Sequence, residues 1–123
     1  MSPENVERIL DVDDLLARCL GNTDFAIRVL EKFQERCDQD LAELERAMVA
    51  EDTKMVGTLA HRLKGASANV SATGMHSLAS KIEQAVHQGT PEEILADLNN
   101  LREEWQLFTS TAPSLIAASK SSC

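Results

Sequence analysis

Apolar residues recur at steps of three and four along most of the chain, which is the spacing of one buried face of an α-helix. The longest run contains Ala26, Leu30, Phe33, Cys37, Leu41, Leu44 and Met48. Three shorter runs follow: Val56, Leu59, Leu63 and Val70; then Met75, Leu78, Ala79, Ile82 and Val86; then Ile94, Leu98, Leu101, Trp105 and Phe108. No stretch alternates with the two-residue period of a half-buried strand. The pattern therefore predicts an all-α protein.

Capping signals separate these runs and add a short helix before them. Gly21 closes a first helix over about Asp11 to Leu20, and Asn22 offers a cap for the long helix that follows. The remaining boundaries are a turn and cap at Glu51-Asp52-Thr53, a turn over residues 71–74, Gly89 as a helix end, and a capping box in Thr90-Pro91-Glu92-Glu93.

The short links favour antiparallel neighbours. We therefore expect an antiparallel up-and-down four-helix bundle with a short additional N-terminal helix. Residues 1–10 are expected to form an N-terminal extension and residues 11–112 the bundle. The Ser- and Ala-rich stretch over residues 113–123, which starts at Pro113, is expected to be a disordered tail.

Charge and cysteine content narrow the classes of partner. The chain has 123 residues, enough for one core, and a net charge of −8, which argues against nucleic acid and anionic membranes as partners. No apolar run reaches the ~20 residues of a membrane span, so no direct membrane insertion is expected. Cys19, Cys37 and Cys123 form no C-x-x-C pair, and no secretory segment precedes them, so a reducing cytoplasmic setting is expected.

The central histidine, His61, lies opposite the core on its helix. At about 100° per residue, Leu59 and Leu63 fall roughly 160–200° away from it. Its own face carries residues within about 60°, which are Lys54, Gly57, Lys64, Gly65 and Ala68. Each glycine costs the helix about 1 kcal/mol relative to alanine, a cost that makes sense if another surface must approach the imidazole closely.

This arrangement suits phosphoryl transfer. A neutral imidazole nitrogen is a good nucleophile near neutral pH, because the unperturbed pKa of histidine is about 6.5. It would attack phosphorus in line, with Lys64 one turn away to offset charge on the phosphoryl oxygens.

The stretch His61 to Val70, HRLKGASANV, resembles the H-x-L-K-G-[SA]-[SA] signature of histidine-containing phosphotransfer (HPt) domains, the carriers of multistep two-component phosphorelays. The resemblance extends to five helices in the same order, over roughly Val12 to Phe108. It implies that His61 is the phosphoacceptor, that Lys64 is the supporting cation and that Gly65 clears space for a receiver domain. Ala68, Gly57, Lys54 and Arg62 would complete the docking surface.

The resemblance also implies the partners. These would be the receiver domains of a hybrid sensor kinase and of response regulators, which supply the acidic pocket and the Mg²⁺. The chain itself would be no enzyme and would carry neither a cofactor nor a metal. A monomer is expected, and Met1 and the tail favour a free-standing carrier.

Two positions depart from the family pattern. Ser71 stands where the family often has glycine, which leaves the following turn open, and Gly74 is a candidate substitute. Glu83 stands where some members hold a glutamine near the histidine. Glu83 either accepts an imidazole N–H or is a solvated charge, and the second reading is preferred.

Other readings have less support. The chain has no phosphate-cradling glycine loop and no kinase signature, and it lacks the Glu-x-x-His pairs of metal-carboxylate bundles. His76 and His87 are expected to be exposed bystanders, and Asp11-x-Asp13-Asp14 lacks the glycine and final glutamate of a calcium loop. The alternative that stays open is a non-catalytic adaptor bundle, which would need an exposed apolar docking surface.

Overall fold

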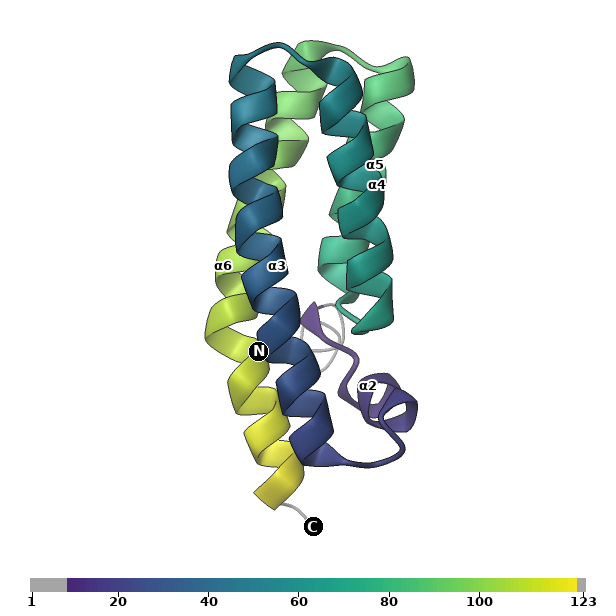
Figure 1. Cartoon of the computed structure of the whole chain (residues 1–123), viewed down its shortest axis with the longest axis vertical. Helices are drawn as coiled ribbons and strands as arrows, with labels where there is room; N and C mark the ends of the chain where they lie inside the picture. The colour runs from purple at the N-terminus through teal and green to yellow at the C-terminus, as the bar shows by residue number, and fades with distance from the viewer. Residues whose placement is uncertain (1–8, 122–123) are drawn as a thin grey trace.

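A computed structural model describes residues 9–121, so residues 1–8 of the expected extension and Cys123 lie outside it. Its helices are α2 (Val12–Arg18), α3 (Thr23–Val49), α4 (Thr53–Asn69), α5 (Thr73–Gln88) and α6 (Pro91–Ser121). The described residues contain no strand. Helices α3 to α6 run alternately up and down and form a four-helix bundle, with α2 packed at the lower end below α4 and α5 (Figure 1). The predicted fold class is confirmed.

Side-chain caps begin four of the helices, and the sequence predicts three of them, all except the cap at Asp11. Asp11, Asn22 and Asp52 each accept a hydrogen bond from the backbone N–H three residues on, at 3.0–3.1 Å. The Thr90 hydroxyl caps α6 by accepting from the N–H of Glu93 at 3.2 Å. Each cap satisfies a backbone donor that the helix itself leaves unpaired.

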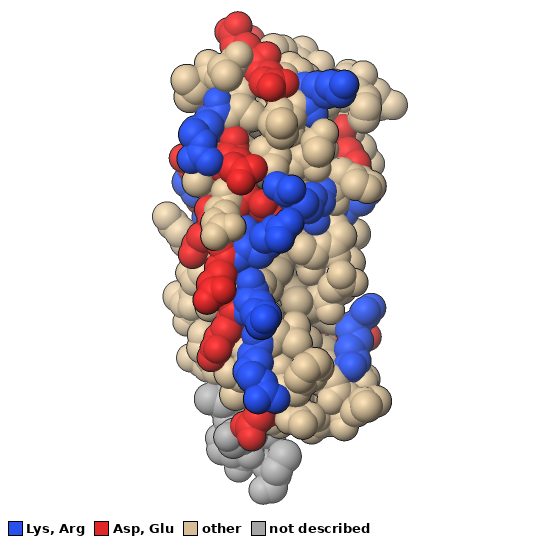
Figure 2. Space-filling model, viewed as in Figure 1, with Lys and Arg blue, Asp and Glu red and all other residues tan. Residues whose placement is uncertain are grey.

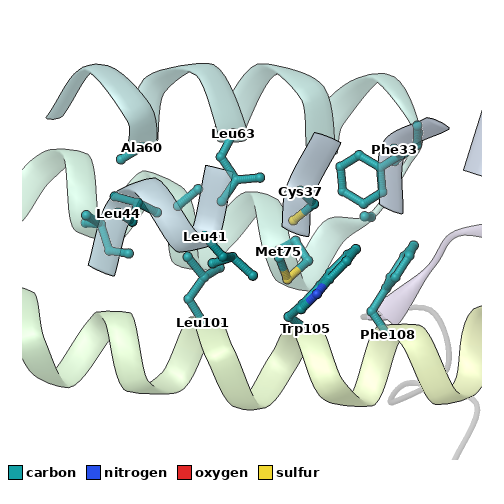
Figure 3. Packing of buried hydrophobic residues seen from close by; sticks show 14 of the residues in the cluster. Phe33, Cys37, Leu41, Leu44, Ala60, Leu63, Met75, Leu101, Trp105 and Phe108 are labelled. Carbon is teal, nitrogen blue, oxygen red and sulfur yellow. The ribbon is translucent and has the colours of Figure 1, made fainter. Parts of the chain in front are cut away.

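The core lies along the bundle axis, and its largest side chains gather between α3 and α6 (Figure 3). Phe33 contacts Trp105 and Phe108 edge-on, with ring centroids 5.8 and 5.4 Å apart. Trp105 stacks on Phe108, and its indole N–H donates to Asp38 Oδ1 at 2.8 Å. The indole N–H is the one polar group of the buried Trp105 side chain, and it therefore has a hydrogen-bond partner.

The last helix is longer than the sequence predicts. α6 continues through Pro113 to Ser121, so the expectation of a disordered tail from residue 113 is wrong for the described residues. Proline within a helix costs about 3 kcal/mol, because it removes one hydrogen bond and its ring meets the preceding turn. Phe108 and Ala112, just before it, are completely buried. The burial of these two residues against the core stabilises α6, so the helix continues past Pro113.

The packed domain also begins earlier than expected. Ile9 and Leu10 are buried, with exposures of 0% and 1%, although both fall within the predicted extension. Their burial fills the lower end of the bundle, where α2 lies. The boundary after residue 10 therefore cuts through the core.

The turn between α4 and α5 is made by Ser71. This residue has a φ of +60°, the left-handed conformation that glycine usually supplies after a helix. Its hydroxyl donates to Asp14 Oδ2, and its carbonyl accepts from the N–H of Asp11 at 2.9 Å. Gly74, expected as a substitute, lies buried within α5. The contacts with α2 therefore hold a strained serine in place.

Candidate functional site

His61 projects from the middle of α4 into solvent. Its side chain is 70% exposed, whereas Leu59 and Leu63 on the opposite side are buried at 1% and 0%. The helical arithmetic therefore places the imidazole correctly. An exposed ring on a rigid helix is accessible to a second macromolecule.

Glu83, on α5, holds both His61 and Lys64. Its Oε2 lies 2.6 Å from His61 Nδ1, and its Oε1 lies 2.6 Å from Lys64 Nζ. The preferred reading of Glu83 as a solvated charge is therefore wrong. The sequence could not reveal this contact, because it depends on how α4 and α5 are rotated against each other.

The contact with Glu83 determines which nitrogen of the His61 imidazole carries the proton. An ionised carboxylate only accepts hydrogen bonds, so Nδ1 must be the donor. In the neutral ring, Nε2 then carries the free lone pair. The hydrogen bond from Lys64, with a smaller contribution from His61, lowers the pKa of Glu83 against the opposing effect of partial burial. The carboxylate is therefore ionised near neutral pH.

The glycines of the predicted docking face differ in their surroundings. A Cβ built on Gly65 would meet no atom within 4 Å, and Ala68, one turn further, is exposed. A Cβ on Gly57 would instead lie 3.2 Å from Cγ1 of Val86 on α5. The prediction that Gly57 clears the outer face is therefore wrong, because Gly57 serves the contact between two helices.

The two remaining cations of the predicted surface lie apart from His61. Lys54 is exposed two turns away on the same side of α4. Arg62 turns toward α3, where it donates to Asp40 Oδ1 at 3.1 Å and approaches Glu43 Oε2 at 3.5 Å. The structure thus assigns Arg62 to the α3–α4 contact and leaves Lys64 as the cation beside Glu83 and His61.

Asp40 is a buried charge that the sequence analysis missed. Its side chain is only 2% exposed, and Arg36 lies 3.8 Å away in addition to Arg62. A signal was present, since Asp40 stands three residues after Cys37 and four before Leu44, on the buried stripe of α3.

The other histidines form no second site. His76 is half-buried and His87 is exposed. Within residues 9–121, no group of three or more His, Cys, Asp or Glu side chains is placed to hold a metal ion. In the same range, no helix is long and apolar enough to cross a membrane. Both histidines are expected to be exposed, and the structure bears this out for His87, whereas His76 is partly buried.

One of three comparisons with known proteins found a match. The family model for the Hpt domain matches residues 28–116, which include all of α4 and α5 and most of α3 and α6. Searches of curated proteins and of solved structures gave no match. The matched range contains His61, Lys64, Gly65 and Glu83 and covers well over half of the chain, and the chain therefore belongs to the Hpt domain family.

Proposed function

We propose that His61 accepts a phosphoryl group from the aspartyl phosphate of a receiver domain and passes it to the aspartate of a second receiver. Membership of the Hpt family makes the chain a phosphotransfer carrier in general terms. The observation that carries the specific assignment is the contact of Nδ1 with Glu83, which leaves Nε2 of an exposed ring as the free nucleophile.

The transfer step balances without a cofactor on this chain. A bond forms between Nε2 and phosphorus as the bond between phosphorus and the aspartyl oxygen breaks, and the aspartate leaves as a carboxylate. Positive charge develops on the ring during attack, and Glu83 lies 2.6 Å from Nδ1 to stabilise it. The Mg²⁺ that this chemistry needs would be held by the receiver.

Lys64 is the cation available to the transferred group. In the unphosphorylated protein its ammonium group is bonded to Glu83, and 30% of its side chain is exposed. Since an ion pair of this exposure contributes at most about 1 kcal/mol, Lys64 can exchange Glu83 for a phosphoryl oxygen at little cost. Gly65, with open space around it, lets the receiver's acidic pocket approach.

The proposed partners are receiver domains of a hybrid sensor kinase and of response regulators, in a cytoplasmic relay. A contact that must form and dissociate in each cycle is expected to be small, below about 1,200 Å² of buried surface. The chain is expected to act as a monomer.

The assignment is tested by phosphorylating receiver domains of the source organism with acetyl phosphate and Mg²⁺ and then adding the full chain. We expect at least one receiver to label the chain with an acid-labile, base-stable phosphate, and His61→Gln to abolish the label. His76→Gln is the matched control and should be labelled normally. Circular dichroism checks that both variants fold. Labelling of His61→Gln, or a chain that no receiver labels, would overturn the proposal and favour the adaptor reading.

A further inference from the structure

A groove opens at the upper end of the bundle, away from the described ends of the chain (Figure 1). It has a volume of about 600 Å³ and lies between the end of α3, the start of α4 and the start of α6. Its apolar lining consists of Ala47, Met48, Val56, Pro91, Ile94 and Leu95. Val56 and Ile94 are buried at 1% and 6%, whereas Leu95 is 51% exposed. The groove therefore offers an apolar floor with one exposed apolar wall.

The rim of this groove is acidic. Glu51, Asp52 and Glu92 line it, all three are exposed, and none forms an ion pair with a residue that the structure describes. Figure 2 shows acidic side chains at this upper end, with a basic side chain near them and further acidic side chains along the rest of the visible face. A ligand that fills the floor with apolar groups would therefore bring positive charge to the edge.

Exposed apolar side chains are concentrated near the groove. Val49 at 86%, Met55 at 44% and Leu95 at 51% all lie within four residues of a helix end that lines it. The remaining large exposed apolar residues of the described chain, Leu20 and Phe25, lie near the opposite end, around the start of α3. Apolar surface gathered beside a groove is typical of an interaction site.

We propose that this groove, which we call the end groove, binds a basic amphipathic segment of a partner protein. Apolar side chains of the segment would occupy the floor over Val56 and Ile94, and its Lys or Arg residues would pair with the acidic rim. A second copy of this chain is disfavoured, since it would present the same acidic rim to its twin. Nucleic acids and anionic membranes are disfavoured by the same charge.

Binding at the end groove would leave His61 accessible. Asp52 on the rim and His61 are nine residues apart, or about 13 Å along α4 at 1.5 Å per residue. The imidazole also contacts Glu83 of α5, and neither residue lines the groove. The groove would thus hold the carrier within a larger assembly while receivers exchange phosphoryl groups at the side.

The experiment uses a fluorescein-labelled helical peptide of about 14 residues as probe, with leucines at i, i+3, i+4 and i+7 and lysines on both flanks. Fluorescence anisotropy with the full chain should show saturable binding, with a dissociation constant of about 10–100 µM. Leu95→Lys and Glu92→Lys should each weaken it by about tenfold or more, because one removes the apolar wall and the other inverts the rim. Leu20→Lys, which changes an exposed leucine at the opposite end, is the matched control and should bind normally.

Several outcomes would overturn the proposal. They are no saturable binding to the wild-type chain, equal binding of a peptide with glutamates in place of the lysines, and equal losses in Leu20→Lys and Leu95→Lys. His61→Gln should bind the peptide as the wild type does, so a failed phosphorylation assay and a failed binding assay remain distinguishable.

Discussion

His61 and Arg62 are neighbours on α4, yet their side chains meet very different carboxylates. His61 turns toward α5 and contacts Glu83, which is 21% exposed and also binds Lys64. Arg62 turns toward α3 and contacts Asp40, which is 2% exposed. The two flanks of one helix thus carry two ion-pair networks, one open to water and one anchored in the protein interior.

The difference in burial indicates which network can change during function. A partly exposed pair contributes little to stability, so under the proposed function its members would change partners when a phosphoryl group reaches His61. A buried carboxylate that loses its cation lowers the stability of the fold strongly, because its charge is then neither paired nor solvated. We therefore assign the α5 side to transfer and the α3 side to holding α3 and α4 together.

The largest stability effect is expected from breaking the α3 side. Arg62→Ala should lower the free energy of unfolding by about 2–3 kcal/mol, less than the 3–5 kcal/mol typical of a broken buried pair because Arg36 remains 3.8 Å from Asp40. Urea denaturation measures this loss, and the initial rate of phosphotransfer should stay within about threefold. Arg102→Ala, which breaks an exposed pair with Glu45, is the control and should cost under about 0.5 kcal/mol. Equal losses in the two variants would contradict the contrast.

The largest effect on the transfer rate, after removal of His61 itself, is expected from Glu83→Gln. A glutamine oxygen still accepts from Nδ1, but it lacks the charge that stabilises the ring as Nε2 bonds to phosphorus. We expect phosphotransfer to slow about tenfold, or about 1.4 kcal/mol in the barrier, in single-turnover assays. Glu45→Gln, at the surface pair with Arg102, should transfer at the wild-type rate. An unchanged rate in Glu83→Gln would remove the electrostatic role assigned to this residue.

Two glycines of α4 sharpen the comparison between open and packed sides. Gly65→Ala should stabilise the protein by about 0.5–1 kcal/mol, because alanine favours the helix and its methyl group meets nothing within 4 Å. Gly57→Ala should stabilise less or even destabilise, since its methyl group would lie 3.2 Å from Val86. Thermal unfolding of the pair measures the difference. A larger gain at position 57 than at position 65 would be inconsistent with the described packing.

The smallest effect concerns acid. The hydrogen bond from Lys64 lowers the pKa of Glu83 from its usual 4.5, and that of His61 adds to the shift. A carboxyl group with a lowered folded-state pKa stabilises the fold above its unfolded pKa, and this contribution is lost as the pH falls through the folded value. The stability difference between wild type and Glu83→Gln should therefore be under about 1 kcal/mol at pH 7 and shrink as the pH falls from the usual carboxyl pKa of 4.5 through the lowered pKa of Glu83 in the folded protein. Urea denaturation across this range tests it, and a difference that grows on acidification would contradict it.

Local patterns predicted most of the fold and the direction of His61. Periodic apolar residues gave the helices, and the position of Leu59 and Leu63 placed the imidazole opposite the core. Contacts between helices were missed, because the partnership of Glu83 with His61 and Lys64 depends on the rotation of α5 against α4. The same holds for Gly57, whose neighbour Val86 lies 29 positions later.

The ends of the domain were also missed, for a different reason. Pro113 is a strong local stop signal, and only the burial of Phe108 and Ala112 against the rest of the protein shows why α6 continues past it. Ile9 and Leu10 precede the first predicted helix, and only their burial in the structure shows that they belong to the core. Tertiary packing thus overrides local preference where the two conflict.

The unequal lengths of the helices give the molecule two zones of different resistance to opening. With 27 and 31 residues, α3 and α6 are about 40 and 46 Å long, whereas α4 and α5, with 17 and 16 residues, reach only about 25 Å. At the lower end, α2 and residues 9 and 10 therefore take the place of two helices (Figure 1). Amide hydrogens there should exchange through local opening, and those of α4 beside His61 only when the whole bundle unfolds. The proposed phosphoacceptor is thus expected to stand on a slowly exchanging part of the chain, where opening of the chain ends leaves its geometry unchanged.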